Sequence, residues 1–136
     1  MVSGLLEQDH KVEIVAPKNS KLLETSKKVK VHFVEGEEQK SWQHEDYYAA
    51  VKIPNNSLLS GMIEKAISIG KKADIILNFS YDWLPIWMTL NINIPIAHII
   101  SMGSESLVIS NLISNVYSKY PNNFAFHSRT QASDYS

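Results

Sequence analysis

The fold is decided by two stretches of sequence, Ala73-Asp-Ile-Ile-Leu-Asn-Phe79 and Ile94-Pro-Ile-Ala-His-Ile-Ile100. The first is almost continuously apolar after its second residue, which is typical of parallel strands covered on both faces. Helix-like periodicity surrounds the two stretches, at Ser57 to Gly70, Asp82 to Leu90 and Ser104 to Tyr120. Such alternation of strands and helices predicts an α/β fold with a parallel sheet and right-handed crossovers.

Further segments extend this pattern toward both ends. Strands are expected at Lys11 to Ala16, Val29 to Val34 and Phe124 to Phe126, and partial helices at Met1 to Gln8 and Ser128 to Ser136. A doubly wound sheet normally begins with a strand and a glycine-rich turn, and neither precedes the first helix here. We therefore expect one partial Rossmann-like domain over residues 1–136, with helices on both faces of the sheet and the first strand lacking.

Serine and glycine mark the expected helix ends. Ser57 and Ser104 stand before apolar-periodic segments, where a serine oxygen can accept a hydrogen bond from the first turn. Gly70 suits the position just after a helix, because glycine tolerates a left-handed backbone. We therefore expect Ser57 and Ser104 as N-caps and Gly70 as the residue that ends its helix.

The composition excludes several classes of protein. The 136 residues are 44% hydrophobic and 20% charged, which is typical of one globular domain. Thirteen basic and fourteen acidic residues give a net charge of -1, so no broad basic field favours nucleic acid or an anionic membrane. The lack of cysteine excludes disulfides and thiolate chemistry. No apolar stretch approaches the roughly 20 residues of a membrane span, and no signal peptide is recognisable, so we expect a soluble cytoplasmic protein.

Motifs for cofactor and metal chemistry are absent from the sequence. It contains no G-x-G-x-x-G, no G-x-x-x-x-G-K-[ST] and no G-x-S-x-G. The five histidines lie far apart, so neither a metal site nor a cofactor is expected. His98 lies within an apolar strand, and we interpret it as a core or cleft-edge histidine rather than a base.

Polar residues follow three of the predicted strands, where ligands of open parallel sheets bind. Asp82 follows the third strand, Ser101, Gly103 and Ser104 follow the fourth, and His127 follows the last. Backbone N–H groups beside Gly103 suit an anionic or hydroxyl-rich ligand, and His127 could transfer a proton near neutral pH. Asp82 and Ser104 also suit a simpler role as helix caps, and both interpretations stay open at this point.

Four segments resemble one known family in order and spacing: Leu5 to Pro17, Asp74 to Pro85, Ile94 to His98 and Phe124 to Ala132. They are similar to the L-x-x-R-G-H-E-V-x-V-x-A-P, D-V-V-H-x-H-x-x-x-x-x-P, V-P-V-V-x-T and S-x-x-Q/A segments in the N-terminal domain of glycosyltransferase family 4. The loop Ser101-Met-Gly-Ser104 resembles that of cyanobacterial-type enzymes that glucosylate a reduced pterin, such as tetrahydrobiopterin, from UDP-glucose.

The resemblance implies a GT-B architecture, in which two Rossmann-like domains face a cleft and the N-terminal one holds the acceptor. Enzymes of this family retain the anomeric configuration, need no metal and pass through an oxocarbenium-like state. For this chain the resemblance implies the acceptor-side half, with a small-molecule acceptor bound near Asp82, Ser101, Gly103, Ser104 and His127. It assigns no catalytic residue here, and the donor-binding domain with its paired glutamates lies outside the chain, which leaves the chain's own enzymatic activity open.

Departures from the family pattern concern both structure and site. Asp9 replaces the glycine before His10, so we expect the first helix to end without a left-handed residue. Asn78 and Ser80 stand where a histidine is common, and Met102 stands where the family has the histidine of a "H-G" pair. The last change removes a side chain that the family associates with sugar contacts.

A second hypothesis is a non-catalytic Rossmann-like module that binds a partner chain or a small molecule. The sheet edge exposed by the lacking strand would then favour self-association. A flavodoxin-like binder of a phosphorylated cofactor is disfavoured, because Pro17-Lys-Asn-Ser20 follows the first visible strand as an ordinary turn.

Overall fold

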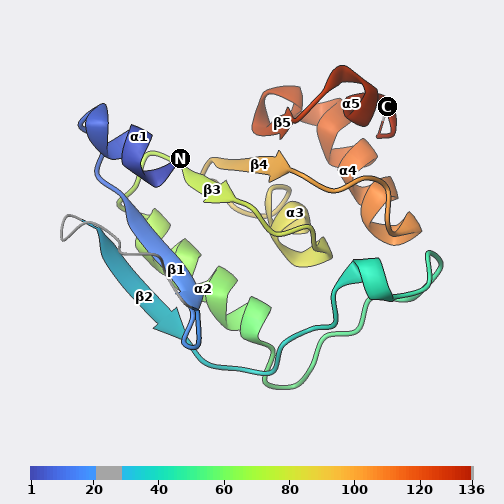
Figure 1. The fold of residues 1–136 in the computed structure, drawn as a ribbon, viewed down its shortest axis with the longest axis horizontal. Coiled ribbons are helices and arrows are strands. Elements are labelled where there is room, and N and C mark those ends of the chain that lie inside the picture. Colours follow the sequence, from blue (N-terminus) through green and yellow to red (C-terminus); the bar gives the residue numbers. More distant parts are fainter. Residues whose placement is uncertain (21–28, 136) are drawn as a thin grey trace.

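The structure, a computed structural model, describes residues 1–20 and 29–135, which form an α/β arrangement (Figure 1). The strands are β1 (Glu13–Pro17), β2 (Lys30–Val34), β3 (Ile76–Asn78), β4 (Ile96–Ile100) and β5 (Phe124–Phe126). The helices are α1 (Val2–Glu7), α2 (Leu58–Gly70), α3 (Trp83–Met88), α4 (Leu107–Lys119) and α5 (Arg129–Ser133), with short 3-10 helices η1 (Trp42–His44) and η2 (Pro121–Asn123). The predicted α/β class and the order of its elements are confirmed, and Ser136 lies outside the described residues.

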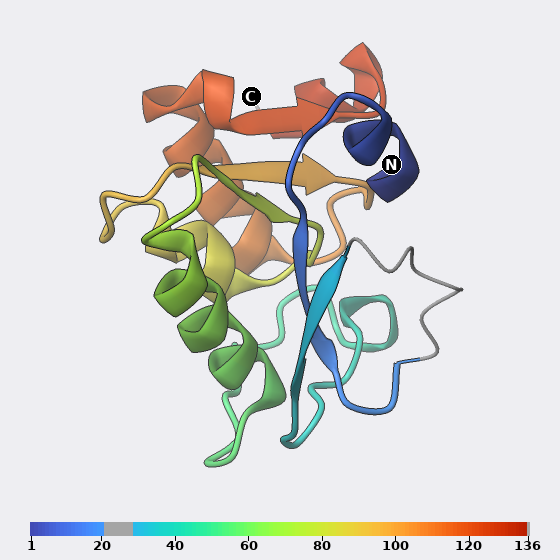
Figure 2. The same ribbon diagram turned by 90° about the vertical axis from the view of Figure 1, so that its left-hand side faces the viewer.

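The strands pair in parallel, as predicted, but they are divided between two small sheets. β1 pairs with β2 in one sheet, and the other has the order β3-β4-β5. Among residues 1–20 and 29–135, no strand joins β1 to β3, so each of these two strands keeps an unpaired edge. The strands of the two sheets run at a clear angle to each other in Figure 2.

Helices lie on both sides of the strands. Figures 1 and 2 show α1 on the opposite side from α2. α2 packs on β1 and β2, and its last residue, Gly70, lies against Ile76 of β3. On the side facing away from α2, Ile75, Leu77 and Phe79 expose 48%, 37% and 53% of their surfaces. This apolar face of β3 is therefore much less covered than a parallel strand normally is.

The main core lies between the three-stranded sheet and helices α3 and α4. Its buried members are Trp42, Tyr81, Ile86, Ile100, Ile109, Ile113, Val116 and Tyr135. Tyr117 of α4 makes edge-to-face contacts with Phe124 and Phe126 of β5, and Tyr135 stacks on Phe126. These contacts fix the last strand and the chain beyond it on α4.

Of the three helix ends expected at Ser57, Ser104 and Gly70, one is confirmed and two differ. Ser57 Oγ accepts from Ser60 N at 3.1 Å and caps α2, as predicted. The prediction of Ser104 as the cap of α4 is wrong, because the helix begins later and Ser106 Oγ accepts from Ile109 N. Gly70 is the last residue of α2 and has no positive φ, so the prediction that it ends the helix in a left-handed conformation is wrong; a Cβ there would come within 2.8 Å of Ile76 Cδ1, so β3 packs closely on the end of this helix.

The end of α1 corrects another expectation. Asp9 adopts a φ of 61°, the left-handed conformation that glycine would normally supply. His10 N then donates to Leu5 O at 3.0 Å, which satisfies one of the last carbonyls of the helix. Aspartate enters this region more readily than most residues, so replacement of the glycine did not remove the left-handed turn.

Candidate functional site

Asp82 lies at the carboxyl end of β3 and caps α3. Its Oδ1 accepts from Trp83 N at 2.7 Å and its Oδ2 accepts from Trp42 Nε1 at 3.3 Å. The residue is only 8% exposed, and burial raises the pKa of its carboxyl although both hydrogen bonds oppose this shift. Both oxygens are thus already engaged by the fold, and a role in acceptor binding stays a prediction.

The loop after β4 is joined to the loop after β3 by a chain of hydroxyl groups. Ser104 Oγ lies 2.7 Å from Ser110 Oγ, which lies 3.3 Å from Tyr81 OH. Glu105 N donates to the same Tyr81 oxygen at 3.2 Å. Hydroxyls both donate and accept hydrogen bonds, so this chain can rearrange to meet a polar ligand without leaving an unsatisfied group.

Ser101 and Gly103 lie in the same loop and face few constraints. Ser101 is exposed at the end of β4. Gly103 lacks a positive φ, and a Cβ there would meet only Glu105 Oε1, at 3.9 Å. Neither backbone strain nor packing therefore requires a glycine at this position.

His127 is exposed just after β5, and the fold holds its backbone rather than its ring. His127 N donates to Gln131 Oε1 at 2.8 Å. Gln131 Nε2 in turn donates to Met102 O at 2.8 Å, and Tyr135 OH donates to the same oxygen at 3.0 Å. Gln131 therefore clamps the loops after β4 and β5 together, a role that the sequence did not predict although Gln131 lies in the segment that resembles the S-x-x-Q/A pattern.

The segment between β2 and α2 crosses the same edge, which the sequence did not predict. Trp42 lies in a polar stretch, yet it is 7% exposed and belongs to the main core. Leu107 N donates to Tyr47 O at 2.9 Å and so fastens the segment to the start of α4. The sequence signal for this anchoring is the presence of large aromatic residues, Trp42, Tyr47 and Tyr48, within a polar stretch.

His98 is a core histidine, as predicted. It is fully buried in β4, with Nδ1 3.1 Å from Asn78 Nδ2 and Nε2 2.7 Å from Thr89 Oγ1. Burial lowers its pKa to about 4. The Asn78 amide nitrogen can only donate, so Nδ1 accepts and the proton of the neutral ring lies on Nε2. His98 stays neutral at physiological pH.

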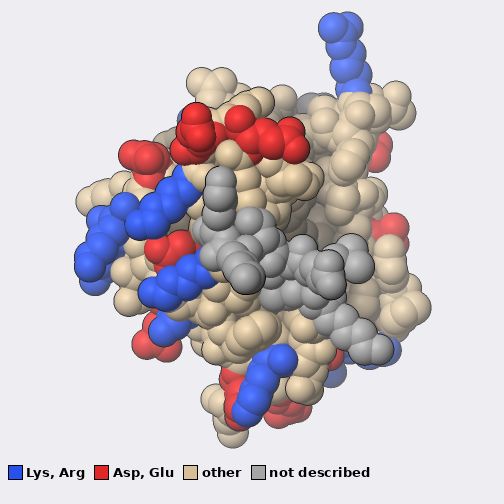
Figure 3. Space-filling view, turned by 60° about the vertical axis from the view of Figure 1, so that its left-hand side comes forward, with Lys and Arg blue, Asp and Glu red and all other residues tan. Residues whose placement is uncertain are grey.

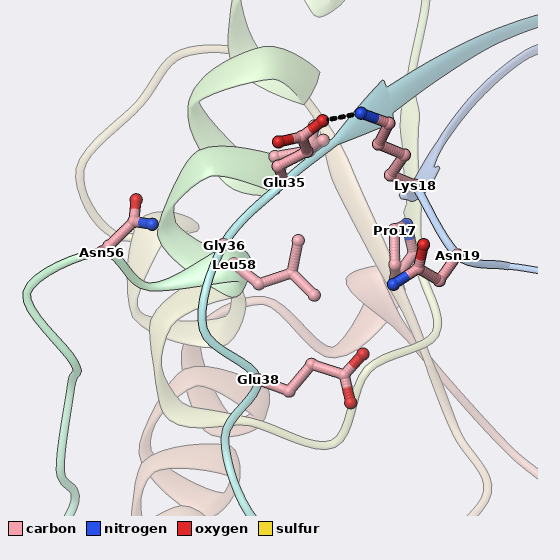
Figure 4. A pocket seen from close by; sticks show the side chains of 9 residues that line it. Pro17, Lys18, Asn19, Glu35, Gly36, Glu38, Asn56 and Leu58 are labelled. Carbon is pink, nitrogen blue, oxygen red and sulfur yellow. Dashed lines mark hydrogen bonds and ion pairs between the residues drawn. The ribbon is translucent and has the colours of Figure 1, made fainter.

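A cavity of about 410 Å³ opens at the carboxyl ends of β1 and β2, beside the start of α2. Its polar lining consists of Lys18, Asn19, Glu35, Glu38 and Asn56. Figure 4 shows Glu38 and Asn19 extending toward each other across the opening, with the Leu58 side chain between the strands and the helix. The sequence predicts only an ordinary turn over Pro17 to Ser20, so this cavity was not predicted.

Three further findings concern surface charge, metal binding and membrane spanning. Acidic and basic side chains are interspersed over the face drawn in Figure 3. Residues 1–20 and 29–135 hold no group of three or more histidine, aspartate or glutamate side chains that could bind a metal ion. Over the same residues, no helix has the length and apolar character needed to cross a membrane.

Comparison with known proteins identifies no relative. No protein-family model matches the sequence, and no curated protein matches it. The class of the protein therefore rests on the structure, which is an α/β domain of parallel strands with polar groups gathered at their carboxyl ends.

Proposed function

We propose that this domain is the acceptor-side part of a retaining glycosyltransferase that transfers glucose from UDP-glucose to a small hydroxyl-bearing acceptor such as a reduced pterin. The observation that carries the proposal is the hydroxyl chain of Tyr81, Ser110 and Ser104 beside the exposed loop after β4. The resemblance of four segments to the family, in matching order, adds to it.

The geometry suits acceptor binding more than chemistry on a donor. Hydroxyl and backbone groups near Ser101 and Ser104 can orient a polar heterocycle by exchange of hydrogen bonds. His127 lies at the rim of the same edge, exposed and free to approach a ligand hydroxyl. The acid-base and phosphate-binding groups of the complete reaction would come from the donor-binding domain.

The proposal is tested by calorimetric titration of the 136-residue protein with tetrahydrobiopterin, kept reduced, and separately with UDP-glucose. We expect saturable binding of the pterin, weakened about fivefold by Ser104→Ala, because a single hydrogen bond contributes about 1 kcal/mol. Ser118→Ala is the matched control, since Ser118 Oγ donates to Asn115 O on the exposed side of α4. Lack of saturable pterin binding, or an unchanged affinity in Ser104→Ala, would contradict the proposal.

A second candidate function is an interaction module, and the exposed strand β3 favours it. Its apolar face carries Ile75, Leu77 and Phe79, and both β1 and β3 have unpaired edges. An open apolar strand of this kind pairs readily with a second copy of the same chain. Sedimentation velocity over a range of concentrations would then show a dimer that Leu77→Lys disrupts and Ile53→Lys, at an exposed loop position, does not. A monomer at every concentration excludes this alternative.

A further inference from the structure

We infer that His98 is a positioning residue, which acts through Asn78 to fix the turn after β3 that carries Tyr81 to the candidate site. His98 lies in β4, is fully buried and is not accessible to a ligand. The coupling between His98 and the turn does not depend on the function of the protein, whereas its effect on acceptor binding rests on the proposed function.

The last residue of β3, Asn78, holds the turn by hydrogen bonds to Ser80. Asn78 Oδ1 accepts from Ser80 N at 3.2 Å and from Ser80 Oγ at 2.9 Å, while Asn78 Nδ2 donates to Ser80 O at 3.0 Å. A backbone N–H only donates and a carbonyl oxygen only accepts, so the backbone of Ser80 is compatible with one orientation of the amide. A single buried amide therefore determines how the chain enters Tyr81.

His98 selects this orientation of the Asn78 amide. Asn78 Nδ2 also donates to His98 Nδ1 at 3.1 Å, and Nδ1 can accept because the proton of the neutral ring lies on Nε2. In the reversed amide two acceptors, Asn78 Oδ1 and His98 Nδ1, would face each other in the core. Such a contact leaves both groups unsatisfied and is costly where water is excluded.

The histidine ring is held from two further sides. His98 Nε2 donates to Thr89 Oγ1 at 2.7 Å, which ties the ring to the end of α3. The ring also packs on Phe124 of β5, with centroids 4.9 Å apart and planes inclined by 30°. These contacts keep Nδ1 directed at Asn78, so α3, β4 and β5 together determine the position of a turn that none of them contains.

The turn fixed in this way positions the first hydroxyl group of the candidate site. Tyr81 is 8% exposed, and its OH lies 3.3 Å from Ser110 Oγ and accepts from Glu105 N at 3.2 Å. A turn that is ordered before a ligand arrives lowers the entropic cost of binding. Loss of the amide orientation would release Ser80 and Tyr81, so a ligand would have to order them.

The test compares the wild type with three variants of the 136-residue protein, by ¹⁵N amide spectra and by titration with reduced tetrahydrobiopterin. His98→Leu leaves the Asn78 donor without its acceptor, so the amide shifts of Ser80 to Asp82 should move and the pterin affinity should fall about fivefold. His98→Gln restores an acceptor toward Asn78 and a donor toward Thr89, and should retain the shifts and the affinity. Thr89→Val is the matched control, because it removes the other hydrogen bond of the ring and leaves Asn78 in place.

A second measurement reads the ring itself and decides the matter even if His98→Leu does not fold. The imidazole ¹⁵N shifts of the wild type at neutral pH should show a protonated Nε2 and an unprotonated Nδ1. In Asn78→Asp the carboxylate only accepts, so His98 Nδ1 should gain a proton. A histidine that merely fills space in the core would not change its ring protonation in this way.

Four results would overturn the inference. They are a proton on His98 Nδ1 in the wild type, unchanged amide shifts of the turn in folded His98→Leu, shifts in Thr89→Val as large as those in His98→Leu, and failure of His98→Gln to retain the wild-type shifts. If the wild type binds no pterin, the proposed function fails, whereas the ring and amide shifts still decide the coupling. The two failures are therefore distinguishable.

Discussion

The buried His98 should make the protein lose stability on mild acidification. The folded state lowers the pKa of His98 to about 4 from 6.5, so it stays neutral where the unfolded chain already takes up a proton. Stability is therefore complete above pH 7 and falls as the pH falls from 6.5 toward 4. From the folded and unfolded pKa values of His98, the free energy of unfolding should fall by about 2 kcal/mol between pH 7 and pH 5 and by about 3 kcal/mol in total.

The hydrogen bonds of His98 show why protonation is costly. A second ring proton would lie on Nδ1 and face the Asn78 amide nitrogen, which is itself a donor. Rotation of the Asn78 amide would relieve this clash, but it would break the bonds between Asn78 and Ser80. Burial and hydrogen bonding therefore act in the same direction on the neutral ring.

The assay is urea unfolding at pH 7 and pH 5, followed by tryptophan fluorescence, for the wild type and His98→Gln. Glutamine can accept from Asn78 and donate to Thr89 but does not titrate, so the pH-dependent loss should shrink by about 2 kcal/mol in the variant. His44→Gln, at an exposed position, is the control and should behave as the wild type. Equal losses in the wild type and His98→Gln would refute the reasoning, and an imidazole NMR titration of His98 above pH 5 would do so independently.

Four further substitutions test the structure. Trp42→Phe should lower the free energy of unfolding by about 1–3 kcal/mol, because the buried Asp82 carboxylate loses its Trp42 donor; a change under about 0.5 kcal/mol in urea unfolding would contradict this. Asp9→Gly should raise the free energy of unfolding by about 0.5–1 kcal/mol, and the melting temperature with it, because glycine adopts the left-handed conformation without steric strain. A lower melting temperature would argue against the turn at φ 61°. Gly36→Ala should lower the free energy of unfolding by about 1–3 kcal/mol or prevent folding, because its Cβ would clash with the backbone of Leu58. Gly103→Ala should change the free energy of unfolding by less than about 0.5 kcal/mol. Denaturant midpoints that reverse this order would contradict the packing at the two glycines.

Local patterns predicted the fold wherever a single element decides the outcome. The apolar runs around Ile76 and Ile96 became parallel strands, and Ser57 became the cap of α2. Helix starts were less certain from the sequence, because Ser104 and Ser106 are both able caps and only the packing of α4 chooses between them. The division into two sheets also could not be predicted, since it depends on which strands meet in space.

The convergence of the loops after β4 and β5 was predicted, the side chains that join them were not, and the binding role of these loops stays a prediction. The rule that ligands bind beyond the carboxyl ends of parallel strands led to the loops around Ser101 and His127, which the structure joins through Gln131. It could not predict Trp42, whose anchoring depends on a hydrogen bond to Asp82, 40 residues away in the sequence. Long-range contacts of this kind leave no periodic signal in a single sequence.

The most direct test of the central claim is an amide chemical-shift titration of the 136-residue protein with tetrahydrobiopterin. The account predicts saturable shifts at the loop after β4, around Ser101 to Ser104, and at His127, because hydrogen bonds join these two loops at one edge of the sheet. Shifts confined to the exposed face of β3, or no saturable shifts at all, would contradict an acceptor site at the carboxyl edge.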